Sequence, residues 1–181
     1  KISPEKMTSA IQAALRDSDP ARSMMNFAQL LKELTPENGA AAFKAVRETV
    51  TGSEAMRYMP MLAYSWGAID GENALKALRD TGGREGMFSS AATLAGWASA
   101  DPDAAKKWLT ENSSAENASF LNRALVTGLA RNDLEAATHY VMGLKDDERA
   151  QYVDVLLEQK FKDGMPGAAE WAKTLSDSKM Q

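Results

Sequence analysis

Residues 66–75 read WGAIDGENAL, and the same order of residue types returns as WASADPDAA at 97–105 and LARNDLEAA at 129–137. Each stretch opens with a large apolar residue, reaches an aspartate four positions later and then arrives at small alanines. This order indicates a helix that ends, a tight turn, and a second helix that begins. Alanine lets two helix backbones approach closely, and the large residue fills the space beyond the contact. The sequence therefore predicts an antiparallel helix pair as its repeated unit.

The pattern continues more loosely on both sides of these three copies. FKDGMPGAA at 161–169 follows it, and LKELTPENGAA at 31–41 is a fifth candidate. The large apolar residues that lead the copies recur at near-regular intervals; they are Leu31, Trp66, Trp97, Leu129 and Phe161. One helix pair cannot bury its apolar face alone, so stacked pairs are expected to share a continuous core in which these residues are anchors.

Helix starts are well marked along the chain. Four dipeptides place a capping side chain before a proline at the first helical position: Ser3-Pro4, Asp19-Pro20, Thr35-Pro36 and Asp101-Pro102. With the breaks at glycine and serine, the predicted helices run over 4–16, 19–33, 36–50, 53–69, 71–80, 84–100, 102–112, 115–131, 133–143, 146–162 and 165–175. We expect one all-α domain over residues 1–181, in which helix 4–16 caps five antiparallel pairs at 19–50, 53–80, 84–112, 115–143 and 146–175.

The repeat resembles the tetratricopeptide repeat, a family that places a Leu-Gly pair and an aromatic residue on its first helix and an alanine early in its second. Two sets of residues carry the resemblance: Leu62, Ala63, Trp66 and Ala74, and then Leu94, Trp97 and Ala105. The repeated unit is slightly shorter here than the roughly 34 residues of the family. The stretch 101–109 also looks similar to degenerate repeats of large bacterial proteins of unassigned role. The resemblance implies a right-handed α-α superhelix, or solenoid, that binds proteins or peptides, and it carries over no catalytic residue.

Pro60 and the methionines around it mark the most irregular part of the predicted repeat. A proline inside helix 53–69 removes a backbone donor and clashes with the preceding turn, so it predicts a kink or a split there. Flexible thioethers suit adaptable binding surfaces, and a kink beside methionines and tyrosines would open a groove. The residues expected to bind a peptide in a groove lined by first helices are Arg57, Tyr58, Tyr64, Asn122 and Arg123.

Residues with catalytic or metal-binding chemistry are scarce in this sequence. The chain has no cysteine and one histidine, His139, which we interpret as a helix-surface or partly buried residue. It contains no Gly-x-Ser-x-Gly elbow, no His-Glu-x-x-His motif, no EF-hand loop and no phosphate-binding loop. We therefore expect no catalytic residue, no metal site and no cofactor, and a protein that is not an enzyme.

Charge and hydropathy argue against two further classes of protein. The net charge is −4, and no basic cluster is longer than Lys106-Lys107, which argues against a nucleic-acid surface. No apolar run approaches the roughly 18 residues of a membrane-spanning helix, so no membrane insertion is expected. The absence of cysteine and the start at Lys1 instead of methionine favour an exported or periplasmic bacterial protein over a cytoplasmic one.

The leading functional hypothesis is a non-catalytic helical-repeat scaffold that binds an unidentified protein or peptide along a groove. One alternative is a helical accessory domain of a larger bacterial envelope enzyme. Another is a self-associating structural protein whose end pairs stack between copies. Trp108, Tyr140 and Trp171 recur on predicted second helices, where they serve either core packing or a binding surface.

Overall fold

The computed structural model describes the backbone of residues 1–78, 81, 83–114 and 116–177, and within these ranges the side chains of all residues except 163, 165 and 174–177. Over the described residues the chain is all-α, without strands, and neighbouring helices pack antiparallel. None of the described helices is long and apolar enough to cross a membrane. The predicted helix end at 79–80 and the predicted start at residue 115 lie outside the described residues.

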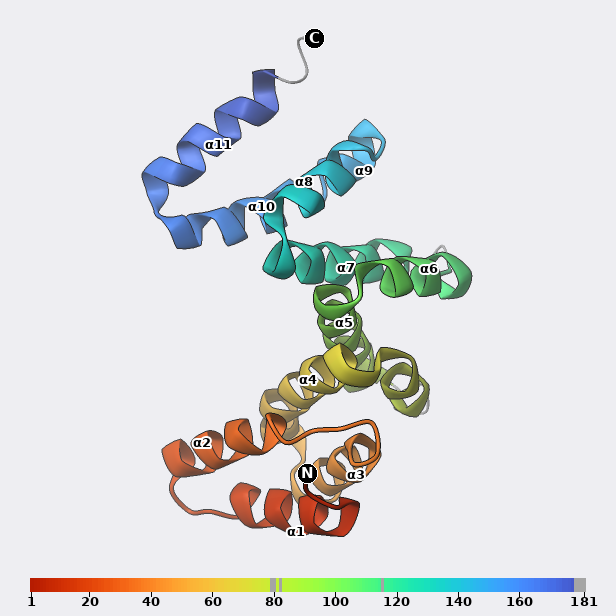
Figure 1. Cartoon of the computed structure of the whole chain (residues 1–181), viewed down its shortest axis with the longest axis vertical. Helices are drawn as coiled ribbons and strands as arrows, with labels where there is room; N and C mark the ends of the chain where they lie inside the picture. Colours follow the sequence, from red (N-terminus) through yellow and green to blue (C-terminus); the bar gives the residue numbers. More distant parts are fainter. Residues whose placement is uncertain (79–80, 82, 115, 178–181) are drawn as a thin grey trace.

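The helices follow one another along the long axis of the molecule, with α1–α3 at one end and α11 at the other (Figure 1). The first four are α1 (Pro4–Leu15), α2 (Pro20–Leu31), α3 (Gly39–Thr49) and α4 (Gly52–Leu78). The next four are α5 (Gly83–Ala100), α6 (Pro102–Asn112), α7 (Ala118–Asn132) and α8 (Leu134–Met142). The C-terminal part contains α9 (Asp146–Arg149), α10 (Val153–Lys160), the 3-10 turn η1 (Phe161–Asp163) and α11 (Met165–Asp177).

Three of the four predicted helix caps are confirmed. The side chains of Ser3, Asp19 and Asp101 each accept hydrogen bonds from backbone N–H groups in the first turn of α1, α2 and α6. The predicted cap at Thr35 is wrong, because α3 begins later, at Gly39. The side chain of Asn38 stabilises the turn before α3. Its Oδ1 accepts a hydrogen bond from the N–H of Thr35 at 2.8 Å, and its Nδ2 donates to two backbone carbonyls.

Pro60 does not split α4, so one of the two outcomes predicted for it, a split of the helix, is wrong. The backbone keeps helical dihedral angles through this residue, and the one non-helical residue inside α4 is Asp70, with φ −153° and ψ 66°. Pro60 has no backbone N–H to donate to the carbonyl of Met56, so one hydrogen bond of the helix is missing here. Asp70 therefore separates a first segment of α4 from a second one, where the sequence predicted the turn of a helix pair.

Asp70 shares its backbone conformation with two other aspartates of the repeat. Asp101 has φ −137° and ψ 84°, and Asp133 has φ −147° and ψ 103°. Asp101 and Asp133 each accept a hydrogen bond from a backbone N–H three residues later. The aspartate of the repeated stretch is thus a turn residue that ends one helix and begins the next.

The small residues of the repeat lie in the core, whereas its large residues differ in burial. The second-helix alanines are almost fully covered; they are Ala74, Ala105, Ala137 and Ala168. Trp66 and Leu129 are only 2% and 3% exposed, and Trp97 packs on Trp108 with a ring distance of 6.3 Å. The prediction that Phe161 is a core anchor is wrong, since it is 46% exposed at the start of η1.

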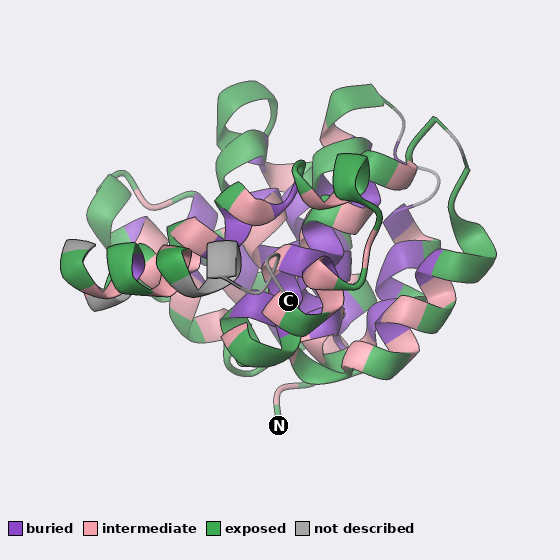
Figure 2. Ribbon diagram, turned by 90° about the horizontal axis from the view of Figure 1, so that it is seen from above, coloured by how far each residue is buried: buried purple, intermediate pink, exposed green. Residues whose placement is uncertain are grey.

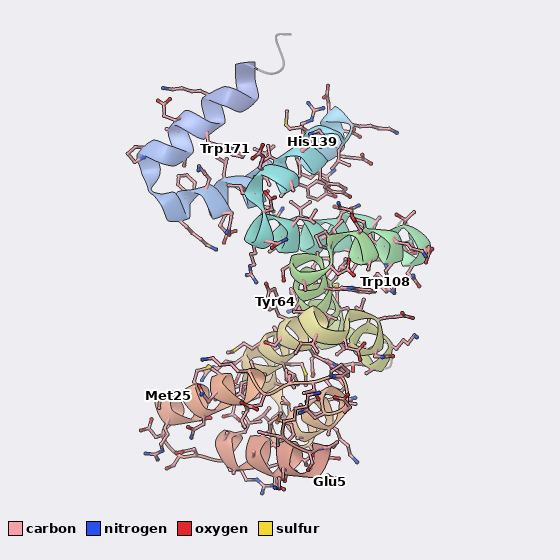
Figure 3. All side chains as sticks on the ribbon, in the orientation of Figure 1. Glu5, Met25, Tyr64, Trp108, His139 and Trp171 are labelled. Carbon is pink, nitrogen blue, oxygen red and sulfur yellow. The ribbon has the colours of Figure 1, made fainter. Side chains whose placement is uncertain are left out.

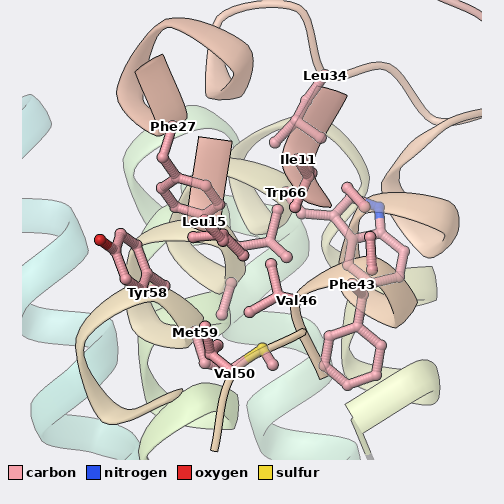
Figure 4. Close-up of a cluster of buried hydrophobic side chains, with 14 of the residues drawn as sticks. Ile11, Leu15, Phe27, Leu34, Phe43, Val46, Val50, Tyr58, Met59 and Trp66 are labelled. Carbon is pink, nitrogen blue, oxygen red and sulfur yellow. The ribbon is translucent and has the colours of Figure 1, made fainter. Parts of the chain in front are cut away.

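A first buried cluster joins α1, α2, α3 and α4 (Figure 4). Met7, Ile11 and Leu15 recur at every fourth position of α1, so one face of this helix is apolar and enters the core. Helix α1 packs against both α2 and α3, and α3 packs against α4. One face of α1 is therefore buried against α2 and α3 at this end of the molecule, while its other face is exposed.

A second buried cluster joins α5, α6, α7, α8 and α10. Figure 2, which looks down the long axis, shows buried residues near the middle of the molecule and exposed ones on the outer turns. The predicted continuous helix 146–162 is wrong, because turns at residues 150–152 separate α9 from α10. Tyr152 lies at this turn, is 3% exposed and packs in the second cluster.

Candidate functional site

Helix α5 packs against α4 on one side and against α7 on the other. Gly96 on α5 faces the backbone of Tyr64 on α4, and Gly128 on α7 faces the backbone of Ala95 on α5. A side chain at either glycine would overlap a backbone carbonyl of the neighbouring helix. The glycines that the sequence places just before Trp97 and Leu129 are therefore the points at which these helices approach closely.

One face of these three helices carries an apolar groove of about 580 Å³. Such a volume is within the range of ligand sites, roughly 300–1,000 Å³. We call it the α4–α5–α7 groove, and its lining is Leu31 with Pro60, Met61, Tyr64 and Ser65 of α4, Phe88, Ala91, Ala92 and Ala95 of α5, and Phe120, Arg123, Ala124, Thr127 and Arg131 of α7. Among the described residues, this lining is mostly apolar and contains no carboxylate.

The groove is lined by equivalent positions of the three helices. Positions 60, 61 and 64 of α4 correspond to 91, 92 and 95 of α5 and to 123, 124 and 127 of α7, each set one repeat further along the chain. Phe88 and Phe120 are also separated by one repeat. The repeat that spaces the buried alanines therefore also spaces the side chains of the groove.

Aromatic side chains form the walls of the groove. Phe88 and Phe120 meet edge to face, with ring centroids 6.1 Å apart. Tyr64 donates a hydrogen bond from its hydroxyl to Ser99 Oγ at 3.1 Å, and the Ser99 hydroxyl donates to the carbonyl of Gly96. These bonds hold the Tyr64 ring in place at the boundary between α4 and α5 (Figure 3).

Two guanidinium groups line the groove, and their surroundings differ. Arg123 forms an ion pair with Asp154 of α10, and it also donates to the carbonyl of Gln151 at 2.9 Å. The hydrogen bonds from Arg123 lower the pKa of Asp154 below its ordinary range, while partial burial acts in the opposite direction. Arg131 lies over the Tyr64 ring, with its guanidinium carbon 4.8 Å from the ring centroid.

The five residues predicted from the sequence to bind a peptide have different locations. Tyr64 and Arg123 line the groove. Tyr58 is 4% exposed and lies in the first core cluster, where its hydroxyl shares a 2.9 Å hydrogen bond with Ser23, so it does not face the groove. Arg57 is exposed on α4 outside the lining, and Asn122 accepts a hydrogen bond from Tyr140 at 3.2 Å.

Phe88, Phe120 and Arg131 are groove residues that the sequence analysis missed. Phe88 and Phe120 occupy the repeat position of Arg57, one and two repeats further along the chain. Alignment of the first helices on the predicted anchors places Arg57, Phe88 and Phe120 in one register, so the repeat itself contained the signal for the two phenylalanines. The contact between Arg131 and Tyr64 is different, since it joins α7 to α4 and depends on how both helices pack against α5.

A second hollow of about 640 Å³ lies beside α6 and is more polar. Trp108, Glu111 and Glu116 are among its lining residues, and Figure 3 labels Trp108. Trp108 packs partly into the second core cluster, which is the core-packing role considered for it. This hollow takes residues from α4, α5, α6, α7 and the turns between them without repeating one helix position, so we regard the α4–α5–α7 groove as the candidate site.

The polar groups considered for catalysis lie apart from the groove. His139 is exposed on α8 (Figure 3). Within the described residues, no three His, Cys, Asp or Glu side chains are grouped so as to hold a metal ion. Comparison of this chain with known proteins assigns it to no family, because no protein-family model, curated protein or solved structure matches it.

Proposed function

We propose that this chain is a non-catalytic helical-repeat scaffold and that its α4–α5–α7 groove binds a peptide segment of a partner protein. The observation that carries the proposal is the repeated lining of the groove, in which equivalent positions of three successive helices face the same hollow. Helical repeats bind extended partners along surfaces of this kind, because each repeat adds one strip of contacts.

The occupant we propose is an elongated segment with large apolar side chains. Ala91, Ala92, Ala95 and Ala124 leave space between the larger lining residues, so the groove can receive side chains that project from a peptide. Phe88 is 39% exposed although it is a large aromatic residue. Exposure of this apolar surface to water is unfavourable, and a partner that covers the ring would remove that free-energy cost. A chain that crosses α4, α5 and α7 would contact all three strips, whereas a compact ligand would contact fewer.

The proposed scaffold is a right-handed α-α superhelix in which first helices pack on first helices. The shared backbone conformation of Asp70, Asp101 and Asp133 supports this arrangement, since it places an equivalent turn after each first helix. The regular spacing of the buried second-helix alanines supports it as well. The contacts of α4 with α5, α5 with α7 and α7 with α10 are the ones that such stacking requires.

Selection from a random peptide library, with the purified chain as bait, tests this proposal. We expect the selected peptides to share two or more large apolar residues. Phe88→Ala should weaken their binding about tenfold or more in fluorescence anisotropy, because a truncated central aromatic commonly costs over about 1.4 kcal/mol. Phe161→Ala is the matched control, since Phe161 is exposed to a similar degree and does not line the groove.

The folding of both variants is checked by circular dichroism before binding is measured. The proposal fails if the library yields no apolar consensus. It also fails if Phe88→Ala and Phe161→Ala bind the selected peptides as tightly as the unmodified chain does.

A further inference from the structure

We propose that the α4–α5–α7 groove recognises a carboxylate on its occupant, and that Arg131 is the side chain that binds it. This inference rests on the proposed peptide-binding function and makes it specific: the bound segment carries an acidic residue beside its apolar anchors. Three properties of the groove support it, namely its charges, the partners of its two arginines and the position of the Arg131 guanidinium.

The charges of the groove contrast with those of the whole chain. The protein has 25 acidic residues against 21 basic ones. Among the described residues, the lining of the groove nevertheless contains two arginines and no aspartate or glutamate. Asp154 compensates the charge of Arg123, so Arg131 is the lining residue whose positive charge favours negative occupants, and the apolar walls strengthen the electrostatic interaction.

The two arginines are not equally available. Arg123 is held by Asp154 and by the carbonyl of Gln151, so its donors already have partners on α10 and in the turn before it. Arg131 forms no ion pair within the part of the chain that the structure describes. Of the two, Arg131 is therefore the residue that can take a new carboxylate without breaking an existing pair.

Arg131 is also fixed in position by the Tyr64 ring. The guanidinium lies 4.8 Å from the centroid of that ring, and the hydroxyl of Tyr64 is tied to Ser99. A guanidinium has five N–H donors, and a ring on one side of it leaves donors that can bind both oxygens of a carboxylate. Little side-chain entropy is then lost when the carboxylate binds, which favours affinity.

The main competing explanation is structural. Arg131 lies in the last turn of α7, where a cation interacts favourably with the helix dipole. Arg47 has a similar setting, because it lies in the last turn of α3 and over the Phe43 ring at 5.7 Å. Arg47 does not line the groove. Arg47→Gln is therefore the matched control: it removes an arginine from the last turn of a helix and from an aromatic ring, but it does not remove the proposed carboxylate site.

The experiment selects peptides from the same random library with the unmodified chain and with Arg131→Gln, and compares the two consensus sequences. We expect acidic residues to be enriched beside the apolar anchors only with the unmodified chain. One selected peptide and its Glu→Gln counterpart are then measured by fluorescence anisotropy against the unmodified chain, Arg131→Gln and Arg47→Gln. The unmodified chain and Arg47→Gln should bind the acidic peptide about tenfold more tightly, and Arg131→Gln should bind both peptides equally.

The outcomes separate this inference from the proposed function. An apolar consensus without acidic residues, or equal binding of the two peptides by the unmodified chain, overturns the role of Arg131 and leaves the groove function standing. The absence of any apolar consensus overturns both. If Arg131→Gln does not fold, the comparison of the two peptides on the unmodified chain, repeated at low and high salt, still decides whether a carboxylate is recognised, because an ion pair weakens with salt.

Discussion

Replacing Gly96 by alanine should destabilise this protein, although alanine is ordinarily the better helix former. Gly96 lies inside α5, where alanine would favour the helix by about 1 kcal/mol. A Cβ atom on Gly96, however, would lie 2.8 Å from the carbonyl carbon of Tyr64, closer still to its oxygen, and 3.1 Å from the nitrogen of Ala68. All of these atoms belong to the backbone of α4, which cannot relieve the overlap by changing rotamer as a side chain can.

The size of the effect follows from this geometry. Carbon atoms in contact prefer a separation of about 3.5 Å or more, so α4 and α5 must move apart by at least about 0.7 Å. Overpacking a core costs about 1–3 kcal/mol, and a clash with backbone places Gly96 at the upper end. After the helix preference of alanine is subtracted, the net loss is about 2 kcal/mol, which lowers the Tm of a chain of this length by ~4–8 °C.

Thermal unfolding followed by circular dichroism measures the change, with Gly143→Ala as the control. A Cβ on Gly143 would meet its nearest neighbour, the carbonyl oxygen of Tyr140, at 3.5 Å, and the residue already has a right-handed conformation with φ −78°. The control should therefore gain about 0.4–1 kcal/mol through the loss of unfolded-state entropy. If Gly96→Ala has a Tm equal to or above that of the unmodified chain, the close approach of α4 and α5 that shapes the groove is refuted.

Three further changes test other parts of the structure. Asp101→Ala removes the cap of α6 and should lower the free energy of unfolding in urea by about 1 kcal/mol; an unchanged value would contradict the capping role. The hydrogen bond from Arg22 lowers the pKa of Asp17 from an ordinary 3.8 to about 2, so the charged carboxylate stabilises the fold above pH 3.8 and this contribution disappears as the pH falls toward 2. Asp17→Asn should therefore be less stable than the unmodified chain at pH 7, and urea titrations should show the difference shrinking toward pH 2. Tyr58→Phe leaves the buried Ser23 hydroxyl unpaired and should cost about 1 kcal/mol of stability, whereas peptide binding measured by anisotropy should not change.

The contrast between Tyr58 and Tyr64 illustrates why the site was only partly predictable. Both tyrosines lie on α4, six positions apart, and therefore on different faces of the helix. Tyr58 is buried because Phe27 of α2 packs edge to face against it at 5.0 Å. Tyr64 faces the groove, where it contacts Ser99 of α5 and Arg131 of α7. The neighbours that decide the role of each tyrosine lie on other helices, far away in the chain, so helical periodicity could separate the two faces of α4 but could not say which face is covered.

Local signals in the sequence determined most of the helices and the spacing of the repeat. The caps at Ser3, Asp19 and Asp101 act through hydrogen bonds that reach two or three positions along the chain, so they can be recognised from short stretches. The register of the buried alanines is likewise a property of sequence spacing. Only the tertiary structure decided which face of the first helices is covered and which is left open. The reason is physical: the walls of the groove come from three helices, and their separation depends on backbone contacts at Gly96 and Gly128 that exist only once the helices have packed.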